Sequence, residues 1–451
     1  MRRGAAASAV LSEAPEPAGT EAAVARYRGT RVYIPWVGKT LFDFMGRFGL
    51  DIRCEMPPGD LDHGLIVISF PHSTKPPRLV EVFDQLRGVW TEELRQAAIE
   101  RRVRIVLDAS AEGYPPARPR LEAIHRGFQG LGVPVEAGVL LTQDRGYAAT
   151  YARYLRKARA GSGLRVINED FWIRRFHQQF LRRGAAAFAR RLADFEARPK
   201  VRSRRFVSLN LTPRATKVLF LLSLIRDDLW SQGYVSCGGL MKKTGRFDTL
   251  AELAVTADYV LAKLGGGGTF EELAGQLLPF FPALQAKGQI LLGEVELEGP
   301  FGRPKGTPIN PMLREYDDSW FTAVTETEMR TWRSRITEKS FGPLVNFHPM
   351  VVFGNPGSLS AVRGFGYQTF GAVIDESYDD IEDPGRRFAA AYQQFTRLCR
   401  MDPDELVRME DRLREALVFN AEWGLVRLPA IYRDRLGLAF LDRLFEARSS
   451  A

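Results

Sequence analysis

The chain has few of the residues from which disulfide frameworks and metal centres are built. Only three cysteines and five histidines occur in 451 residues, and Cys54, Cys237 and Cys399 lie far apart. Neither residue type has the spacing of a zinc site. The sequence therefore predicts no disulfide framework, and a reducing cytoplasm is the expected compartment.

Long apolar runs and several familiar enzyme motifs are also absent from the sequence. No stretch approaches the roughly 18 consecutive apolar residues that a membrane span needs. Residues 1–25 are rich in Ala, Pro and Glu and lack the apolar core of a secretory signal. No Gly-x-Ser-x-Gly, Walker loop or His-Glu-x-x-His occurs, so hydrolase, NTPase and zinc-protease functions have no support. We expect a soluble protein, and peripheral association with a membrane stays open.

What the chain does have is an excess of positive charge. Sixty-three Lys and Arg residues stand against 54 Asp and Glu, which gives a net charge of +9 and a pI near 9.5. This excess favours anionic partners such as nucleotide diphosphates, acidic glycans, membrane surfaces or nucleic acid, without choosing among them. A length of 451 residues allows two or three domains, each with its own core.

Short apolar segments alternate with amphipathic ones in the first part of the chain. The pattern predicts helices at 89–102, 119–131 and 147–158, and strands at 31–35, 65–70, 103–108, 135–141 and 164–167. Strands separated by helices of about 10–15 residues predict right-handed crossovers and a parallel sheet. This is a doubly wound α/β domain.

A second alternating unit follows a charged stretch. Residues 195–205 are poor in apolar side chains and contain Pro199, which indicates a linker. Beyond it come a strand at 206–210, an apolar helix at 215–229 and amphipathic helices at 404–418 and 434–447. We therefore expect a disordered segment at 1–27, a first domain at 28–198, a second at 199–430 and a final helical segment at 431–451.

A basic loop opens the apolar helix of the second domain. Asn210 to Lys217 follow a strand and lead into a helix, which in a doubly wound fold is the end of the sheet where ligands bind. Arg214 can hold a phosphate bidentately and Lys217 can act as a point charge beside it. The alternative is a basic first turn that faces water, with Pro213 starting the helix. Because a cation at a helix N-terminus is locally unfavourable, an anion is expected there.

A second basic segment lies at 335–354. Thr337 is a suitable N-cap for a short apolar helix, Lys339 adds a full charge to its first turn, and Glu338 can accept hydrogen bonds from sugar hydroxyls. A buried strand and a Gly-Asn-Pro-Gly turn follow. This combination suits a nucleotide-sugar. The alternative is a solvated Glu-Lys pair on a helix.

The same segment resembles a known family. Ile336-Thr337-Glu338-Lys339, followed about ten residues later by a Pro-x-Val-Val-x-Gly strand at 349–354, is similar to the donor-site signature of α1,3-fucosyltransferases. The stretch to Asp375–Asp379 is also similar to bacterial and phage proteins thought to be glycosyltransferases, and the resemblance spans about 203–400. It implies that Glu338 contacts the nucleotide ribose and Lys339 the diphosphate. The complete predicted donor-binding set is Asn210, Arg214, Lys217, Arg335, Thr337, Glu338 and Lys339.

The resemblance also implies an architecture and a reaction. It predicts two Rossmann-like domains that face each other across a cleft (the GT-B type), with the acceptor domain at 28–198 and the donor domain at 199–430. The segment 431–451 would cross back to the first domain. The expected reaction moves a sugar from a nucleotide-sugar to a glycan or other hydroxyl acceptor, with no metal and no cofactor.

A transferase that inverts the anomeric carbon needs a carboxylate to take the acceptor proton. Glu112 and Asp108 follow a predicted strand of the first domain and are the candidates for this base, with Glu169 and Asp170 as rivals. Each of these carboxylates alone is more typical of a cap or a turn. Among the histidines, His72 stands at a strand end where a loop hydrogen bond is expected, and His348 is expected in the core.

Residues 375–383 contain six carboxylates in nine positions. Such a cluster could hold Mg²⁺ or Mn²⁺. Asp383-Pro384 also has the pattern of a helix start, because acidic side chains complement the positive end of the helix dipole. We expect this run to cap a helix at 385–399 or to close over the donor sugar.

Two functions of other classes stay open. The charge of +9 and the mixed aromatic and basic segment 171–176 would suit a nucleic-acid-binding protein or a glycosyltransferase that modifies DNA. The same segment also predicts an amphipathic helix. A sugar-binding scaffold without catalysis is the third hypothesis.

Overall fold

The computed structural model describes residues 24–36, 40–69, 76–111, 116–246, 249–264, 268–292, 297–298, 303–304, 314–329 and 334–445. These residues form two compact units. The first contains the described residues of 15–175 and 431–451, and the second those of 176–430. Helix α7 (Phe171–Gln178) spans the division. Within the described chain, the search for a helix with the length and apolar character of a membrane span finds none.

The first unit is built on a sheet of six parallel strands. Its order is β2-β1-β3-β4-β5-β6. The strands are β1 (Arg31–Tyr33), β2 (Asp51–Arg53), β3 (Gly64–Ser69), β4 (Val103–Ala109), β5 (Gly138–Thr142) and β6 (Arg165–Asn168). Every residue of β3 and β4 is buried, which explains why their central residues, 65–68 and 105–107, are continuous apolar runs rather than alternating ones.

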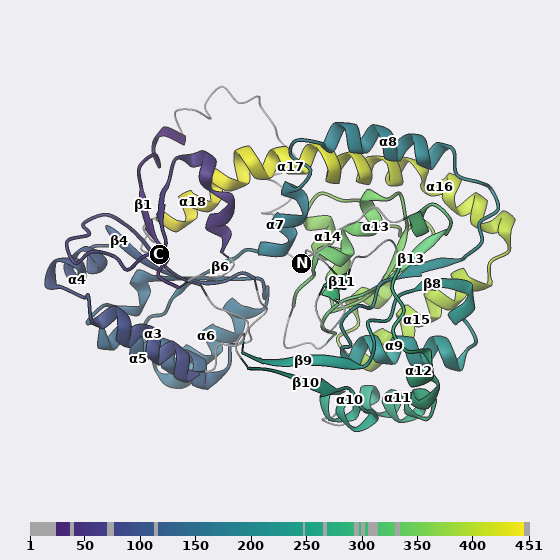
Figure 1. Ribbon diagram of the computed structural model, residues 1–451, viewed down its shortest axis with the longest axis horizontal. Coiled ribbons are helices and arrows are strands. Elements are labelled where there is room, and N and C mark those ends of the chain that lie inside the picture. Colours follow the sequence, from purple (N-terminus) through teal and green to yellow (C-terminus); the bar gives the residue numbers. More distant parts are fainter. Residues whose placement is uncertain are drawn as a thin grey trace. The chain divides into compact units, whose positions relative to one another are not determined.

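Both faces of this sheet are covered, and successive residues of one strand serve different cores. Ile66 and Ile68 pack in a core with residues of α3 (Pro76–Arg87), α4 (Glu92–Ile99), α5 (Arg118–Gly130) and α6 (Tyr147–Ala158). Leu65 and Val67 point into a second core that contains Phe440 and Leu441 of α18 (Gly437–Phe445). Figure 1 shows α3, α5 and α6 on one side of the strands and α18 on the other. The C-terminal helix is therefore part of the core of the first unit.

The second unit has a sheet of four parallel strands in the order β14-β13-β7-β8. They are β7 (Phe206–Ser208), β8 (Gly233–Val235), β13 (Phe321–Thr325) and β14 (Met350–Phe353). The chain builds β8 on one side of β7 and then returns to build β13 and β14 on the other. The strand order thus reverses between β7 and β13, and ligands of doubly wound sheets bind at the carboxyl ends beside such a reversal.

Aromatic rings hold the helices on this second sheet. Phe220 of α9 (Ala215–Arg226) lies 4.8 Å from the ring centroid of Phe353 on β14, and Phe395 of α15 (Pro384–Arg400) lies 4.8 Å from that of Phe206 on β7. The chain continues through α16 (Pro403–Glu422), which runs beside α8 (Gly184–Glu196) (Figure 1). The helices α10 (Ala257–Leu264), α11 (Thr269–Leu277) and α12 (Phe281–Lys287) complete this unit together with an antiparallel hairpin of β9 (Met241–Arg246) and β10 (Thr249–Ala254).

The predicted fold class is confirmed, since both units are α/β with parallel sheets. The predicted elements of the first domain are present, with α6 at 147–158 as expected and a 3-10 turn at Val135–Ala137 where the strand was predicted to begin. Of the predicted disordered segment, residues 1–23 lie outside the described residues. Tyr27, however, is buried in the core with α18. The charged stretch 195–205 lies inside the second unit.

Candidate functional site

Polar side chains meet where the strand order of the second sheet reverses. Thr325, the last residue of β13, donates its hydroxyl to Oδ1 of Asn210 at 2.6 Å. The Asn210 amide group donates to Ser208 Oγ at 3.0 Å, and its backbone N–H donates to Ser236 Oγ at 2.8 Å. Asn210 is 2% exposed. Its side chain therefore fixes the carboxyl ends of β7 and β13 relative to each other.

Lys217 points inward at this same edge. It lies in the first turn of α9, is 2% exposed, and its Nζ lies 3.5 Å from the carbonyl oxygen of Leu209. Burial lowers the pKa of Lys217 to about 7, and the nearby charges of Lys339 and Arg214 act in the same direction. The carboxylates of Glu326 and Glu338 oppose this shift. The alternative of a basic turn that faces water is wrong for Lys217.

Arg214 occupies the N-cap position of α9 and is half-buried. Its backbone is extended there, with φ −103° and ψ 149°, and its side chain makes no capping hydrogen bond. Its charge nevertheless acts on Lys217. The loop therefore brings two cations to the opening of one helix, although positive charge is unfavourable at that end.

Glu326 follows β13 directly and organises the segment that carries Lys339. The residue is 1% exposed, and its carboxylate accepts hydrogen bonds from Thr337 N (3.0 Å), Thr337 Oγ1 (2.7 Å) and Ser340 Oγ (2.7 Å). Sequence reasoning did not find this residue. The β-branched and aromatic run Phe321–Thr325 predicts a strand that ends just before Glu326, but it does not indicate the partners of this carboxylate.

The segment of the predicted motif is a turn rather than a regular helix. Thr337 caps a 3-10 turn at Glu338–Ser340, and α13 (Gly342–Val345) adds only four residues. Elements this short align few peptide dipoles, so a helix dipole adds little attraction for phosphate here. The positive charge at this place comes from side chains instead.

Lys339 forms a partly exposed ion pair with Glu338. Its Nζ lies 3.0 Å from Thr337 Oγ1 and 3.0 Å from Glu338 Oε1, with side-chain exposures of 29% for Lys339 and 24% for Glu338. Burial alone would raise the pKa of Glu338, but Lys339 beside it outweighs this and holds the pKa below its usual value. Glu338 is therefore a carboxylate at neutral pH, able to accept hydrogen bonds from hydroxyl groups.

Two further residues hold the surrounding loops. The backbone N–H of Arg335 donates to Asn355 Oδ1 at 3.1 Å, which ties the start of the motif to the turn after β14, and the Arg335 residue is 9% exposed. Arg387 of α15 is 1% exposed, donates to the carbonyl of Gly354 at 2.9 Å, and also bonds the carbonyls of Met329 and Ile381. Arg387 was missed from the sequence because its partners are backbone atoms, which leave no residue pattern.

These contacts bring together six of the predicted donor-site residues. Asn210 and Thr337 lie at the carboxyl edge and are bonded to neighbours there, while the charges of Arg214, Glu338 and Lys339 act on Lys217. Arg335 is joined to the same region through its backbone. The arrangement offers a partly neutral buried amine, an exposed ammonium and a guanidinium, which suits an anion of two or more charges.

Of the two predicted bases of the first unit, the structure describes only Asp108. Asp108 is 1% exposed and accepts hydrogen bonds from Thr40 Oγ1 (2.6 Å), Leu41 N (2.9 Å), Ser110 N (3.0 Å) and Ser110 Oγ (2.5 Å). Burial raises its pKa and these donors lower it. Such a set of partners suits a structural acceptor rather than a base that faces a hydroxyl group. Glu112 lies outside the described residues, as does His72.

The rival carboxylates are engaged locally. Glu169 forms ion pairs with Arg174, at 3.1 Å, and with Arg443 of α18. Asp170 accepts from the backbone N–H of Ile173 at 2.9 Å at the start of α7. Both therefore have the cap and pairing roles that single carboxylates usually have. Their part in catalysis stays a prediction.

His348 is confirmed as a core residue. It is fully buried, with Nδ1 3.1 Å from Thr322 Oγ1 and Nε2 bonded to the Tyr316 carbonyl at 2.5 Å. Burial holds its pKa well below the usual value. It is a neutral hydrogen-bonding group inside the second unit.

The acidic run at 375–383 is used for backbone capping. Asp383 is the N-cap of α15 and accepts from Arg386 N at 2.8 Å. Asp379 accepts from Leu359 N at 3.0 Å and Ser360 N at 3.2 Å, at the start of α14 (Ser358–Gly364). Over the described residues, a search for three or more His, Cys, Asp or Glu side chains placed to share a metal ion finds none. The expected cap of the helix after Asp383 is confirmed.

The segment proposed for nucleic-acid stacking is helix α7. Phe171 and Phe176 are buried, and Arg174 is fully buried and paired with Glu169. The expected amphipathic helix is confirmed. These three side chains do not form an exposed face that bases could stack on.

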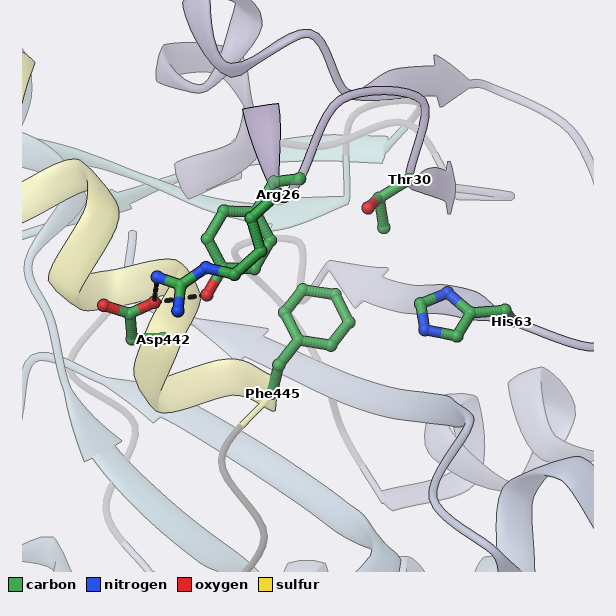
Figure 2. Close-up of a pocket in the computed structure, with 6 residues that line it drawn as sticks. Arg26, Thr30, His63, Asp442 and Phe445 are labelled. Carbon is green, nitrogen blue, oxygen red and sulfur yellow. Dashed lines mark hydrogen bonds and ion pairs between the residues drawn. The ribbon is translucent and has the colours of Figure 1, made fainter. Parts of the chain in front are cut away.

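A pocket of about 480 Å³ lies in the first unit, lined by Arg26, Tyr27, Thr30, His63, Asp442 and Phe445. The ring of Phe445 stacks on that of Tyr27 at a centroid distance of 5.5 Å and on that of His63 at 6.2 Å, and Figure 2 shows Phe445 and His63 side by side. Arg26 and Tyr27 both bond to Asp442. Thr30 and His63 precede β1 and β3, so this pocket is at the amino ends of the strands, the edge opposite to the one where ligands of such sheets bind.

Comparison with known proteins adds little. No family model matches the chain, and no curated protein matches it. Among solved structures it is similar to the crystal structure of a UDP-forming α,α-trehalose-phosphate synthase from Burkholderia xenovorans, with 12% identity over 85% of this chain and 75% of that chain and a TM-score of 0.38. A likeness at this level bears on neither reaction nor substrate.

Proposed function

We propose that this chain is a glycosyltransferase that moves a sugar from a nucleotide-diphosphate sugar to a glycan or another hydroxyl acceptor. The observation that carries the proposal is the convergence of Lys217, Lys339 and Arg214 at the carboxyl edge of the second sheet, next to the reversal of strand order. That edge is where ligands of doubly wound sheets bind. Two cations there, with a buried amine that can take up a proton beside them, favour a diphosphate.

The energetics of Lys217 support an anionic ligand. A buried amine loses hydration that the contact of Lys217 with the Leu209 carbonyl, at 3.5 Å, does not replace. The nearby positive charges of Lys339 and Arg214 add repulsion. A diphosphate at this edge removes both penalties. As the glycosidic bond breaks, the same charges offset the negative charge that develops on the leaving nucleotide, which is the usual electrostatic contribution to such a transfer.

The other predicted residues have parts that fit the proposal. Glu338 is ionised and 24% exposed, so it can accept hydrogen bonds from the ribose hydroxyls. The cations take the place that a metal ion has in metal-dependent transferases, and the proposed reaction needs no metal. The base that takes the acceptor proton stays a prediction, with Glu112 as its candidate.

The test is a thermal-shift screen of the full chain against UDP-, GDP-, CMP- and dTDP-sugars, followed by an assay for release of the nucleotide. A ligand at about 100 times its Kd stabilises the folded state by about 2.7 kcal/mol, which gives a clear shift. We expect one nucleotide class to raise the midpoint and its sugar to be turned over in the presence of EDTA. Binding without turnover would favour the sugar-binding scaffold. If none of these donors binds, the proposal is wrong.

A further inference from the structure

Glu326 places a buried negative charge inside a cluster that we assign to an anion. Its carboxylate acts on Lys217, and Lys217 in turn is acted on by Lys339 and Arg214. A carboxylate near a bound diphosphate repels it. The presence of Glu326 therefore needs a reason other than charge complementarity to the ligand.

The hydrogen bonds of Glu326 supply that reason. One oxygen accepts from Thr337 N at 3.0 Å and from Ser340 Oγ at 2.7 Å, and the other accepts from Thr337 Oγ1 at 2.7 Å. Thr337 and Ser340 are the cap and the last residue of the turn that carries Lys339. One buried side chain thus fixes both ends of this turn to the end of β13.

We propose that Glu326 is the positioning residue of the donor site, and that its carboxylate sets the place of the Lys339 ammonium through the hydroxyl of Thr337. This inference rests on the proposed function for the identity of the anion. The chain of contacts is continuous, from Glu326 to Thr337 Oγ1 at 2.7 Å and from there to Lys339 Nζ at 3.0 Å.

The direction of each hydrogen bond explains how Glu326 can position the Lys339 ammonium through the Thr337 hydroxyl. A threonine hydroxyl has one hydrogen to donate and lone pairs to accept with. Because the hydrogen of Thr337 goes to the Glu326 carboxylate, its lone pairs are left facing the Lys339 ammonium. If residue 326 were a neutral amide, the hydroxyl could rotate to accept from the amide nitrogen, and Lys339 would lose this acceptor.

The two roles considered for Glu326 predict opposite changes in pyrophosphate affinity when its charge is removed, which makes the inference testable. Glu326→Gln keeps the shape and removes the charge. If Glu326 contributed only its negative charge, the variant would bind an anion more tightly. If it positions Lys339, we expect the variant to bind inorganic pyrophosphate about tenfold more weakly, since losing an aligned charged hydrogen bond has an effect of this order.

The measurement is isothermal titration of inorganic pyrophosphate into the full chain and its variants. Glu328→Gln is the matched control, because it removes the same charge two residues along the chain, outside the contacts with Thr337 and Ser340. We expect the control to bind pyrophosphate like the wild type. Unchanged or tighter binding by Glu326→Gln would overturn the inference.

A second pair of variants covers the case in which Glu326→Gln does not fold. Thr337→Ser keeps the hydroxyl between Glu326 and Lys339, whereas Thr337→Val removes it at nearly constant volume. We expect the serine variant to retain pyrophosphate affinity and the valine variant to lose about tenfold. Where both single variants fold, adding Thr337→Val to Glu326→Gln should weaken binding little further, because both changes break one connection. Equal affinities of the serine and valine variants would contradict the positioning role.

The wild-type titrations separate this inference from the proposed function. If the wild type binds neither pyrophosphate, UDP nor GDP, then the donor site itself is wrong and the inference fails with it. If the wild type binds them and Glu326→Gln binds them equally well, the positioning role alone is refuted and the donor site stands.

Discussion

The Nζ atom of Lys339 lies 3.0 Å from Oε1 of the adjacent Glu338, and both side chains reach solvent. Partly exposed ion pairs of this kind contribute about 0–1 kcal/mol to stability. A diphosphate carries more charge than one carboxylate and can draw the ammonium toward itself at little cost. The pair therefore leaves Lys339 available to a ligand and keeps Glu338 ionised beside it.

We expect Lys339→Ala to reduce nucleotide-sugar turnover by one to two orders of magnitude. The charged hydrogen bond that the variant loses is worth about 1.5–3 kcal/mol, and each 1.4 kcal/mol corresponds to about a tenfold change. The measurement is kcat/KM of purified variants for the donor identified by the screen. Lys200→Ala, which removes an exposed lysine of the same unit, is the control. Activity near the wild-type level in a folded Lys339→Ala protein would exclude Lys339 from the donor site.

Burial of Lys217 predicts an unusual dependence of stability on pH. The folded protein lowers the pKa of Lys217 from 10.5 to about 7, so the unfolded chain binds a proton that the folded chain rejects between these values. Stability contributed by this group is lowest below pH 7 and rises with pH up to about 10.5. Between the two pKa values the free energy of unfolding changes by about 1.36 kcal/mol per pH unit, so it should rise by on the order of 2 kcal/mol between pH 7 and 9.

The Lys217→Met variant isolates this contribution. We expect it to be more stable than the wild type at pH 7, and to lose most of that advantage by pH 10, because methionine has no proton to bind. Urea unfolding of both proteins at pH 7, 8, 9 and 10 measures the difference, and Lys200→Met shows what an exposed lysine does. A stability difference that does not change with pH would contradict the low pKa of Lys217.

Ligand binding should return the missing proton to Lys217. At pH 8 an amine with a pKa of about 7 is about nine-tenths neutral, and a diphosphate beside it favours the charged form. We expect uptake of close to one proton per bound nucleoside diphosphate. Calorimetric titration of UDP and GDP in buffers of different ionisation enthalpy measures this number. Zero uptake by the wild type, or equal uptake by Lys217→Met, would show that Lys217 does not contact the diphosphate.

The sequence predicted the strands and helices well where burial is continuous. The run Leu65–Ile68 is apolar at every position because neighbouring residues enter different cores, and that pattern is visible without a structure. The position of Lys217 could be predicted because a loop that follows a strand and opens a helix must lie at the carboxyl edge. Glu326 could not, because its partners stand 11 and 14 residues away and meet it only through the folded path of the chain.

The motif at 336–339 shows that a local sequence pattern does not determine which type of helix forms. Thr337 satisfies the preference for an N-cap and does accept from Lys339 N, at 3.5 Å. The same pattern is compatible with a regular helix or with one 3-10 turn, and the structure has the turn. Its ends are tied to Glu326, so tertiary hydrogen bonds decide the local conformation where intrinsic preference is weak.

The acidic run after β14 offers a direct test of capping against metal binding. Asp383 accepts from Arg386 N at 2.8 Å and from the hydroxyl of Thr269, so Asp383→Ala should lower the free energy of unfolding by about 1 kcal/mol, the usual value of an N-cap. Asp383→Ser can still cap the helix and should restore most of this loss. Thermal unfolding in EDTA and in millimolar MgCl₂ or MnCl₂ completes the test, because a bound cation would add stability in proportion to the logarithm of its concentration over Kd. A rise of the wild-type midpoint with Mg²⁺ or Mn²⁺ that both variants lack would overturn the capping role, since serine preserves a cap but is a poor replacement for a carboxylate ligand.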